Sequence, residues 1–219
     1  MKQTVILLHG MGRTGFSMWF LGRSLKRAGY HVVNLGYPST RKSIGWIVEE
    51  ILVPEIARLG NRQSIHFVTH SLGGIVVRQY LQNHSLPEGS RVVMLAPPNR
   101  GSEVADRLMN WKPYQWLNGP AGQQLGTSKE SVPNRLKPVK AQIGVITGNR
   151  STNPLFSNWI EGDDDGKVGV NSAQLNEMAD FMILPVTHTF IMNNQRVIRQ
   201  VLYFIKNGQF DHDQFLDKK

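Results

Sequence analysis

The chain has no cysteine among its 219 residues. Disulfide bonds, thiolate metal ligands and a cysteine nucleophile are therefore excluded. Long apolar runs are also missing, because Val5 to Leu8 is shorter than the roughly seven apolar residues that a signal peptide needs. The uncharged run from Phe181 to Gln195 contains His188 and falls short of the ~18 residues of a membrane span. These absences predict a soluble, cytoplasmic protein.

Internal repeats, heptads and low-complexity tracts are absent as well, which leaves solenoid and coiled-coil architectures without support. The chain is 40% hydrophobic. A chain of this length and composition can bury one sizeable core. We therefore expect a single domain over residues 1–219.

Acidic residues are scarce: 16 Asp and Glu stand against 25 Lys and Arg, for a net charge of +9. Residues 1–150 carry 19 basic and 7 acidic side chains, whereas residues 151–219 carry 6 and 9. The basic residues are scattered and form no nucleic-acid-binding motif, so no nucleic-acid partner is expected. A solvated basic surface explains this charge, and the alternative is a functional surface that faces anions, such as acidic substrates or, through a weak contact, an anionic membrane surface.

Short β-branched and aliphatic runs recur along the chain, bounded by turn residues and alternating with helical patterns. This order is typical of βα units around a mostly parallel sheet. The sequence therefore predicts the α/β class, with about six strands and helices on both faces of the sheet. The expected strands are residues 3–8, 31–35, 64–69, 91–96, 142–147 and 180–185.

Two further segments show helical periodicity. Apolar residues follow one helical face from Ile44 to Leu52 and another from Val197 to Ile205. Pro54 follows the first segment, so we expect a kink or an end of that helix there.

The stretch of about 97–140 interrupts the βα rhythm with Trp111, Trp116 and four prolines after Pro98. A connection of this length is usually a lid or a binding loop, and a structural insertion on the sheet is the alternative. We interpret it as a cap in which Trp111 and Trp116 contact the substrate. Its basic residues are expected around the rim of the site: Lys112, Lys129, Arg135, Lys137 and Lys140.

Ser71 lies where a predicted strand runs into a helix, within the segment Thr69-His70-Ser71-Leu72-Gly73-Gly74. A sharp strand-to-helix turn can hold a serine nucleophile above a sheet, and its usual pattern is G-x-S-x-G. Thr69 replaces the first glycine, so its side chain must be accommodated. The alternative is that Ser71 is the N-cap of an ordinary helix.

The segment Leu8-His9-Gly10-Met11-Gly12 directly follows the first predicted strand. In acyl transfer, backbone N–H groups must point at the developing oxyanion. One comes from the residue after the nucleophile, here Leu72, and another from the loop after an early strand, here Met11. A plain glycine turn is the alternative interpretation.

A serine nucleophile needs a histidine base and a carboxylate that orients it. Among the seven histidines, His188 alone lies directly after the last predicted strand, where a loop reaches the carboxyl edge of the sheet, whereas His212 lies in the tail. A structural role is its alternative. The acid is expected between Ser71 and His188, in the turn Asp163-Asp164-Asp165. A solvated turn or a Ca²⁺-binding loop would also explain these aspartates.

Taken together, these segments resemble bacterial lipase-like α/β hydrolases, the lipase and acetyltransferase/hydrolase group. The resemblance implies the α/β-hydrolase fold, with Ser71, Asp165 and His188 as the catalytic triad and the N–H groups of Met11 and Leu72 as the oxyanion hole. We choose Asp165 because it directly precedes Gly166, as in the related lipases, and because Asp163 and Asp164 are better placed to be solvated. The matching segments are residues 8–12, 69–74, 96–102, 165–168 and 184–190, with Thr69 and Lys167 departing from the commonest residues.

The resemblance implies a serine carboxylesterase or lipase that cleaves an ester or lipid-like small molecule through an acyl-enzyme, with no cofactor or metal. A thioesterase or an acyltransferase could use the same triad. A binding protein that keeps only this fold is the alternative of a different class, and its mark would be a lost triad residue.

Overall fold

The computed structural model describes residues 3–60 and 64–213. Its centre is a six-stranded sheet, and every pair of neighbouring strands in it is parallel. The strand order is β2-β1-β3-β4-β5-β6. The six predicted strands are thereby confirmed as β1 Thr4–Leu8, β2 His31–Leu35, β3 Ile65–His70, β4 Arg91–Leu95, β5 Gln142–Gly148 and β6 Asp180–Leu184.

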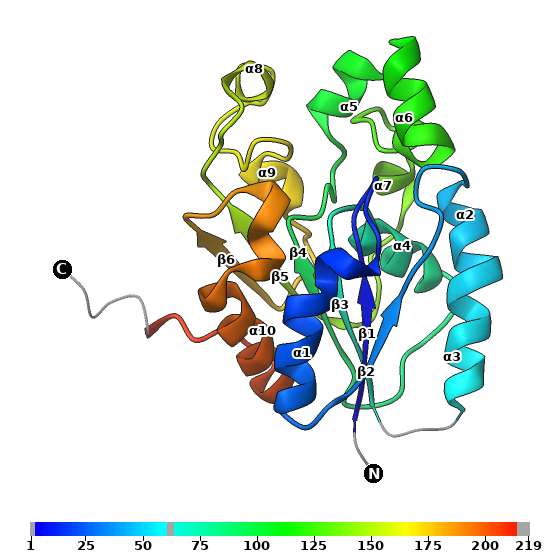
Figure 1. Cartoon of the computed structure of the whole chain (residues 1–219), viewed down its shortest axis with the longest axis vertical. Coiled ribbons are helices and arrows are strands. Elements are labelled where there is room, and N and C mark those ends of the chain that lie inside the picture. Colours follow the sequence, from blue (N-terminus) through cyan, green and yellow to red (C-terminus); the bar gives the residue numbers. More distant parts are fainter. Residues whose placement is uncertain (1–2, 61–63, 214–219) are drawn as a thin grey trace.

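Helices cover both faces of the sheet (Figure 1). Alternate residues of β1 point to opposite faces, as the period of a strand requires. Val5 and Leu7 join the core under α1 (Trp19–Arg27) and α10 (Gln195–Asn207). Ile6 and Leu8 join the core under α2 (Ile44–Ile47), η2 (Val48–Leu52), α3 (Val53–Leu59) and α4 (Leu72–Tyr80).

The predicted C-terminal helix shows why these segments are helical. Asn194 caps α10 by accepting hydrogen bonds from the N–H groups of Arg196 and Val197. Its apolar stripe is buried from Val197 to Ile205. Gly208 ends the helix in the left-handed conformation, with φ of 80°.

The irregularity expected at Pro54 takes the form of a π-helical turn. η2 precedes Pro54, and helical structure then continues through α3 to Leu59. Proline has no N–H to donate, so a regular α-helix that continues past Pro54 would lose a hydrogen bond. A π-helical turn before Pro54 changes the hydrogen-bond register and costs less free energy. The helix therefore does not end at Pro54.

The segment of about 97–140 lies above the carboxyl ends of the strands as α5 (Glu103–Leu108), α6 (Lys112–Gln123) and α7 (Val132–Arg135) (Figure 1). Non-helical φ and ψ at Gly119 kink α6. A Cβ at Gly119 would lie 1.8 Å from the carbonyl oxygen of Thr40, so the kink rests directly on the loop before α2. Gln124 also accepts a hydrogen bond from the N–H of Ile44. The cap is thus anchored to the body of the protein.

The remaining elements surround the same edge of the sheet: η1 (Gly15–Met18), α8 (Pro154–Ser157), α9 (Val170–Ala173) and η3 (His188–Asn193). The chain leaves β1 for β2 on one side and returns to β3 on the other, so the strand order switches direction at β1. Loops diverge at such a point and leave a crevice outside the carboxyl ends of the strands. The loops after β1 and β3, which carry the predicted oxyanion segment and Ser71, flank this crevice. Within the described ranges, no helix is long and apolar enough to cross a membrane.

Candidate active site

Ser71 occupies the sharp turn between β3 and α4. Its φ is 51° and its ψ is −118°, a left-handed region that non-glycine residues rarely adopt. Such a conformation costs about 1–3 kcal/mol and persists only where the surroundings enforce it. Gly73 helps to enforce it, because a Cβ there would lie 2.7 Å from the carbonyl oxygen of Leu8. The start of α4 therefore rests on the end of β1 as closely as backbones allow.

The structure shows how Thr69 is accommodated. Its side chain is fully buried. Gly74 lies against it, and a Cβ on Gly74 would stand 3.5 Å from the Thr69 hydroxyl oxygen and 3.0 Å from Cβ of Pro97. The usual pattern has a glycine at the position of Thr69. Here Gly74 lacks a side chain instead, and this leaves space for the side chain of Thr69.

Ser71, His188 and Asp165 come together in a chain of hydrogen bonds. His188 Nε2 lies 3.1 Å from Ser71 Oγ, and His188 Nδ1 lies 2.8 Å from Asp165 Oδ2. All three residues are buried, with at most 9% of each exposed. An ionised carboxylate only accepts hydrogen bonds, so Nδ1 carries the proton and Nε2 keeps a lone pair for the serine hydroxyl.

The carboxylate of Asp165 is itself held in place. Its Oδ1 accepts hydrogen bonds from the N–H groups of Lys167 at 3.0 Å and Val168 at 2.8 Å. The backbone N–H of His188 donates to the carbonyl oxygen of Asp165 at 2.9 Å. These bonds orient the second carboxylate oxygen, Oδ2, toward the imidazole.

His70 lies behind His188, a role that its position beside Ser71 in the sequence did not indicate. Its Nε2 lies 3.1 Å from the carbonyl oxygen of His188, and the two ring centres are 4.9 Å apart. Burial, and next the charge of His188, lower the pKa of His70 well below its usual value. The neutral ring therefore donates Nε2–H to that carbonyl. A Cβ at Gly10 would lie 2.6 Å from His70 Nδ1, so the loop after β1 closes tightly over the ring.

His9 fixes the loop that carries Met11. The His9 ring stacks on Tyr37 with centres 4.1 Å apart, and Nε2 accepts from the N–H of Tyr37 at 3.3 Å. Its Nδ1–H donates to the carbonyl oxygen of Gly10, and the Tyr37 hydroxyl donates to the carbonyl oxygen of His9. Burial lowers the pKa of His9, so the ring is neutral as these bonds require.

Met11 and Leu72 flank the serine. Leu72 is the first residue of α4, where a backbone N–H has no partner within the helix. Met11 lines the same pocket as Ser71. Both N–H groups thus belong to segments beside the serine hydroxyl.

A pocket of about 420 Å³ opens above Ser71 and His188. Trp111 lines it, but Trp116 is not among its lining residues, and 86% of the Trp116 residue is exposed. The structure therefore brings only one of the two tryptophans to the site. The apolar wall comes mainly from the cap: Val104, Ala105, Leu108, Trp111, Leu117 and Leu125, with Phe156 of α8.

Two basic side chains line this pocket, but they are not the basic residues of the cap that we expected around the site. Arg13 and Lys167 line it, whereas none of the five basic residues expected at the rim of the cap does. Arg13 belongs to the loop after β1 and Lys167 to the acidic turn. Only the convergence of these two loops brings the cations together.

The acidic turn differs from its prediction at Asp164. Asp163 is exposed as expected, but Asp164 is buried, so the expectation that it is solvated is wrong. Its Oδ1 accepts from the Ser157 hydroxyl at 2.9 Å and from the N–H of Gly166 at 2.6 Å, which fixes the turn. Across residues 3–60 and 64–213, no group of three or more His, Cys, Asp or Glu side chains could hold a metal ion.

Comparisons with known proteins agree with this fold. A family model described as "Alpha/beta hydrolase family" matches residues 5–173. The mature form of the lipase BlEst2 from Bacillus licheniformis superposes with a TM-score of 0.72 at 20% identity, covering 93% of this chain and 92% of that one. The phospholipase PlaB from Legionella pneumophila superposes with a TM-score of 0.70 at 19% identity, covering 98% of this chain and 61% of that one.

A monoacylglycerol lipase from Paleococcus ferrophilus has a TM-score of 0.61 at 17% identity, covering 94% of both chains. No curated protein matches the sequence. At these identities the solved structures establish a shared fold.

Proposed function

Because the chain belongs to the alpha/beta hydrolase family, we propose that it is a serine hydrolase that cleaves carboxylic esters, with Ser71 as the nucleophile. The observation that carries the proposal is the continuous hydrogen-bond chain from Ser71 through His188 to Asp165, at 3.1 and 2.8 Å. A serine hydroxyl becomes a good nucleophile only when a base accepts its proton.

The reaction proceeds in two halves. His188 Nε2 takes the hydroxyl proton while Ser71 Oγ attacks the ester carbonyl, and Asp165 stabilises the imidazolium. The N–H groups of Met11 and Leu72 bind the oxyanion. His188 then gives the proton to the leaving alcohol, and an acyl-enzyme on Ser71 remains. Water, activated by the same histidine, hydrolyses that ester and restores the enzyme.

The pocket favours an ester with an apolar acyl group. Most of its cap wall is built from aliphatic and aromatic side chains, and a smaller number of polar side chains, Ser71 and His188 among them, line the rest. Ligand pockets commonly combine an apolar lining with a few polar groups that fix orientation. Several proteins of similar fold are lipases or esterases, which supports ester or lipid-like substrates.

A fluorophosphonate that reacts with activated serines tests the nucleophile. We expect it to label Ser71 alone and to abolish hydrolysis of p-nitrophenyl butyrate, because His188 activates only that hydroxyl. Ser71→Ala should be unlabelled and inactive. Ser24→Ala is the matched control, because its hydroxyl only donates to the carbonyl of Phe20 one helical turn away. Equal labelling of wild type and Ser71→Ala would reject Ser71 as the nucleophile.

A further inference from the structure

Two basic side chains that line the pocket have no charged or hydrogen-bonding partner among the described residues. Arg13 and Lys167 line the same cavity as Ser71 and His188. Neither the guanidinium nor the ammonium group forms a hydrogen bond or an ion pair with any residue that the structure describes. The two cations at the site are thus left to interact with whatever enters it.

The two charges also act on each other. Desolvation, and next the charge of Arg13, lower the pKa of Lys167. Desolvation lowers the pKa of Arg13 as well. Asp165, the carboxylate whose charge raises the pKa of Lys167, already accepts hydrogen bonds from His188 and two backbone N–H groups. An anion between the cations would relieve their repulsion and satisfy their donors.

The position of His188 assigns this anion to the leaving-group side of the substrate. His188 must hand its proton to the oxygen of the departing alcohol, so the alcohol lies beside it. Lys167 is two residues from Asp165, the partner of His188. Phe190 and Asn193 belong to η3, which begins at His188. The apolar wall of the pocket comes from the cap, which is a different segment, so we assign that wall to the acyl group.

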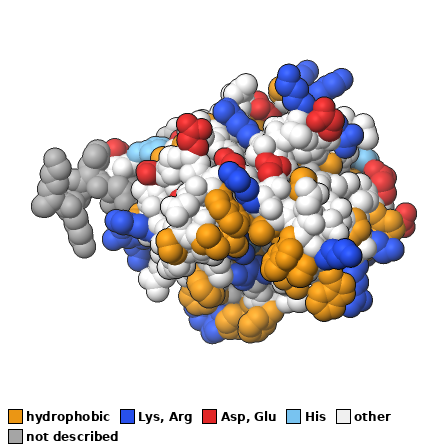
Figure 2. All heavy atoms as spheres, turned by 90° about the horizontal axis from the view of Figure 1, so that it is seen from above, with side chains coloured by type: hydrophobic (Ala, Val, Ile, Leu, Met, Phe, Trp, Pro, Cys, Tyr) orange, Lys and Arg blue, Asp and Glu red, His pale blue; other side chains and the backbone are white. Residues whose placement is uncertain are grey.

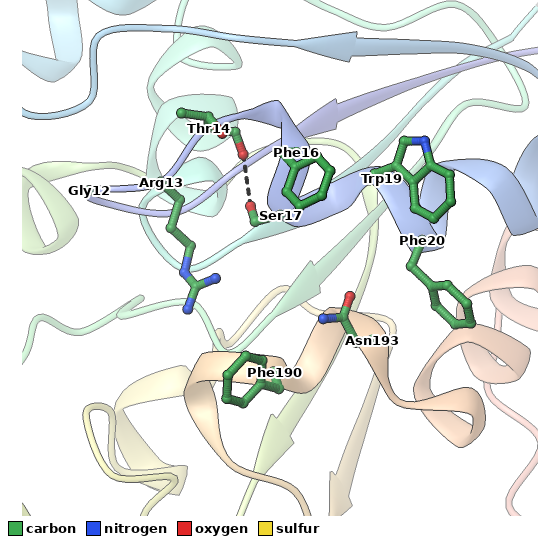
Figure 3. Close-up of a pocket in the computed structure, with 9 residues that line it drawn as sticks. All are labelled: Gly12, Arg13, Thr14, Phe16, Ser17, Trp19, Phe20, Phe190 and Asn193. Atoms are coloured by element: carbon green, nitrogen blue, oxygen red, sulfur yellow. Dashed lines mark hydrogen bonds between the residues drawn. The ribbon is translucent and has the colours of Figure 1, made fainter.

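A second groove continues from the same place. It has a volume of about 660 Å³, and Arg13 lines it as well as the catalytic pocket. Figure 3 shows Phe16, Trp19 and Phe20 on one side and Phe190 and Asn193 on the other, with the side chain of Arg13 pointing toward the gap between them. Phe16 is 82% exposed and Phe190 is 63% exposed. Hydrophobic side chains gather on this end of the molecule with basic ones beside them (Figure 2).

We propose that Arg13 and Lys167 bind an oxyacid anion, such as a phosphate, on the alcohol part of the ester, and that the apolar remainder of this alcohol lies in the groove of Phe16, Trp19, Phe20 and Phe190. This proposal rests on the proposed ester hydrolysis and names its substrate class: esters of anionic alcohols. The planar fork of Arg13 can bind two anion oxygens at once, while Lys167 adds a point charge.

A matched pair of substrates tests the proposal. 1-Butyrylglycerol 3-phosphate and 1-butyrylglycerol share the acyl group and the glycerol and differ only in the phosphate. In the wild type we expect kcat/KM to be at least about tenfold higher for the phosphate ester, the size of one charge-assisted hydrogen bond. The ratio of the two kcat/KM values should fall by about tenfold in Arg13→Gln and also by about tenfold in Lys167→Gln. Because the readout is a ratio, a general loss of activity cancels.

Arg23→Gln is the control for net charge. Arg23 lies over the ring of Trp19 at 5.5 Å but lines neither cavity. Its removal should leave the ratio unchanged. A wild-type ratio near one both for this pair and for the corresponding pair of oleoyl esters, or an equal fall in Arg23→Gln, would overturn the proposal while leaving ester hydrolysis intact. If neither ester is cleaved and Ser71 resists fluorophosphonate, the proposed function itself fails.

A second measurement needs no turnover. Glycerol 3-phosphate should slow fluorophosphonate labelling of Ser71 in the wild type and lose this effect in Arg13→Gln. Equal labelling rates with and without glycerol 3-phosphate in the wild type would count against the site.

The corresponding pair of oleoyl esters, dispersed as a lipid, separates two sources of the anion. A preference confined to that pair supports a lipid headgroup as the ligand, and a preference in both pairs supports a soluble phosphate ester.

Discussion

Three adjacent aspartates have three different surroundings, which shows how strongly the role of one residue depends on its contacts. Asp165 faces His188, Asp164 fixes the turn through Ser157 and Gly166, and Asp163 is exposed. Identical carboxylates at neighbouring positions thus differ in role: in the proposed mechanism Asp165 orients the base, whereas Asp164 stabilises the turn and Asp163 faces solvent.

Asp165→Asn should keep the fold but lower kcat by up to about 10⁴-fold. The amide of Asn can still accept from the N–H groups of Lys167 and Val168, but its NH₂ group then faces His188 and favours the wrong tautomer. Steady-state hydrolysis of p-nitrophenyl butyrate measures the change. Asp163→Asn is the control and should retain near-normal activity. Loss in that variant together with normal activity in Asp165→Asn would reassign the acid.

At the scale of elements, α6 separates its two tryptophans. Trp111 is the N-cap of α6 and lines the pocket, whereas Trp116 lies on the exposed side of the helix. A helix turns 100° per residue, so equally apolar residues on one helix meet different surroundings. Of the two tryptophans, only Trp111 lines the pocket that we propose for the acyl group.

Trp111→Ala should therefore shift the preference among p-nitrophenyl esters toward longer acyl chains. The expected change in relative kcat/KM is about fourfold for each methylene group that gains or loses apolar contact. Trp116→Ala is the matched control and should keep the wild-type profile. If both variants keep that profile, Trp111 does not set acyl preference and the pocket is bounded elsewhere.

At the scale of the whole molecule, buried neutral histidines couple stability to pH. His66 is fully buried on β3, and its Nδ1 accepts from the N–H of Arg91 at 3.1 Å. Burial, and next the charge of Arg91, lower the pKa of His66 from 6.5 to about 4. Burial lowers the pKa of His9 and of His70 too. At mildly acidic pH these histidines are therefore protonated in the unfolded chain but stay neutral in the folded protein.

The free energy of unfolding should fall as the pH drops from about 6.5 to about 4, because only the unfolded state protonates His66 in that window. Above this window both states are neutral and the effect vanishes. The full contribution of His66 is about 3 kcal/mol. Urea unfolding at several pH values measures the decline, and His66→Gln should make it shallower. An unchanged slope in that variant would show that His66 does not titrate differently on folding.

The βα order could be predicted from local sequence patterns, because β-branched runs and helical periodicity reflect burial on one face. The sequence also located Ser71 and His188, since a strand-to-helix turn and a loop after the last strand are readable along the chain. The resemblance to lipase-like hydrolases selected Asp165 from its neighbours.

Which loops meet could not be predicted from the sequence, because it depends on the packing of segments that lie far apart in the chain. The convergence of Arg13 with Lys167 depends on the order of the strands, which places the loop after β1 and the acidic turn around one crevice. The space that Gly74 leaves for Thr69 and the position of His70 behind His188 are likewise contacts between segments. The burial of Asp164 against Ser157 depends on how its own loop folds back. No periodicity encodes such distances, because they arise when the helices and loops pack against the finished sheet.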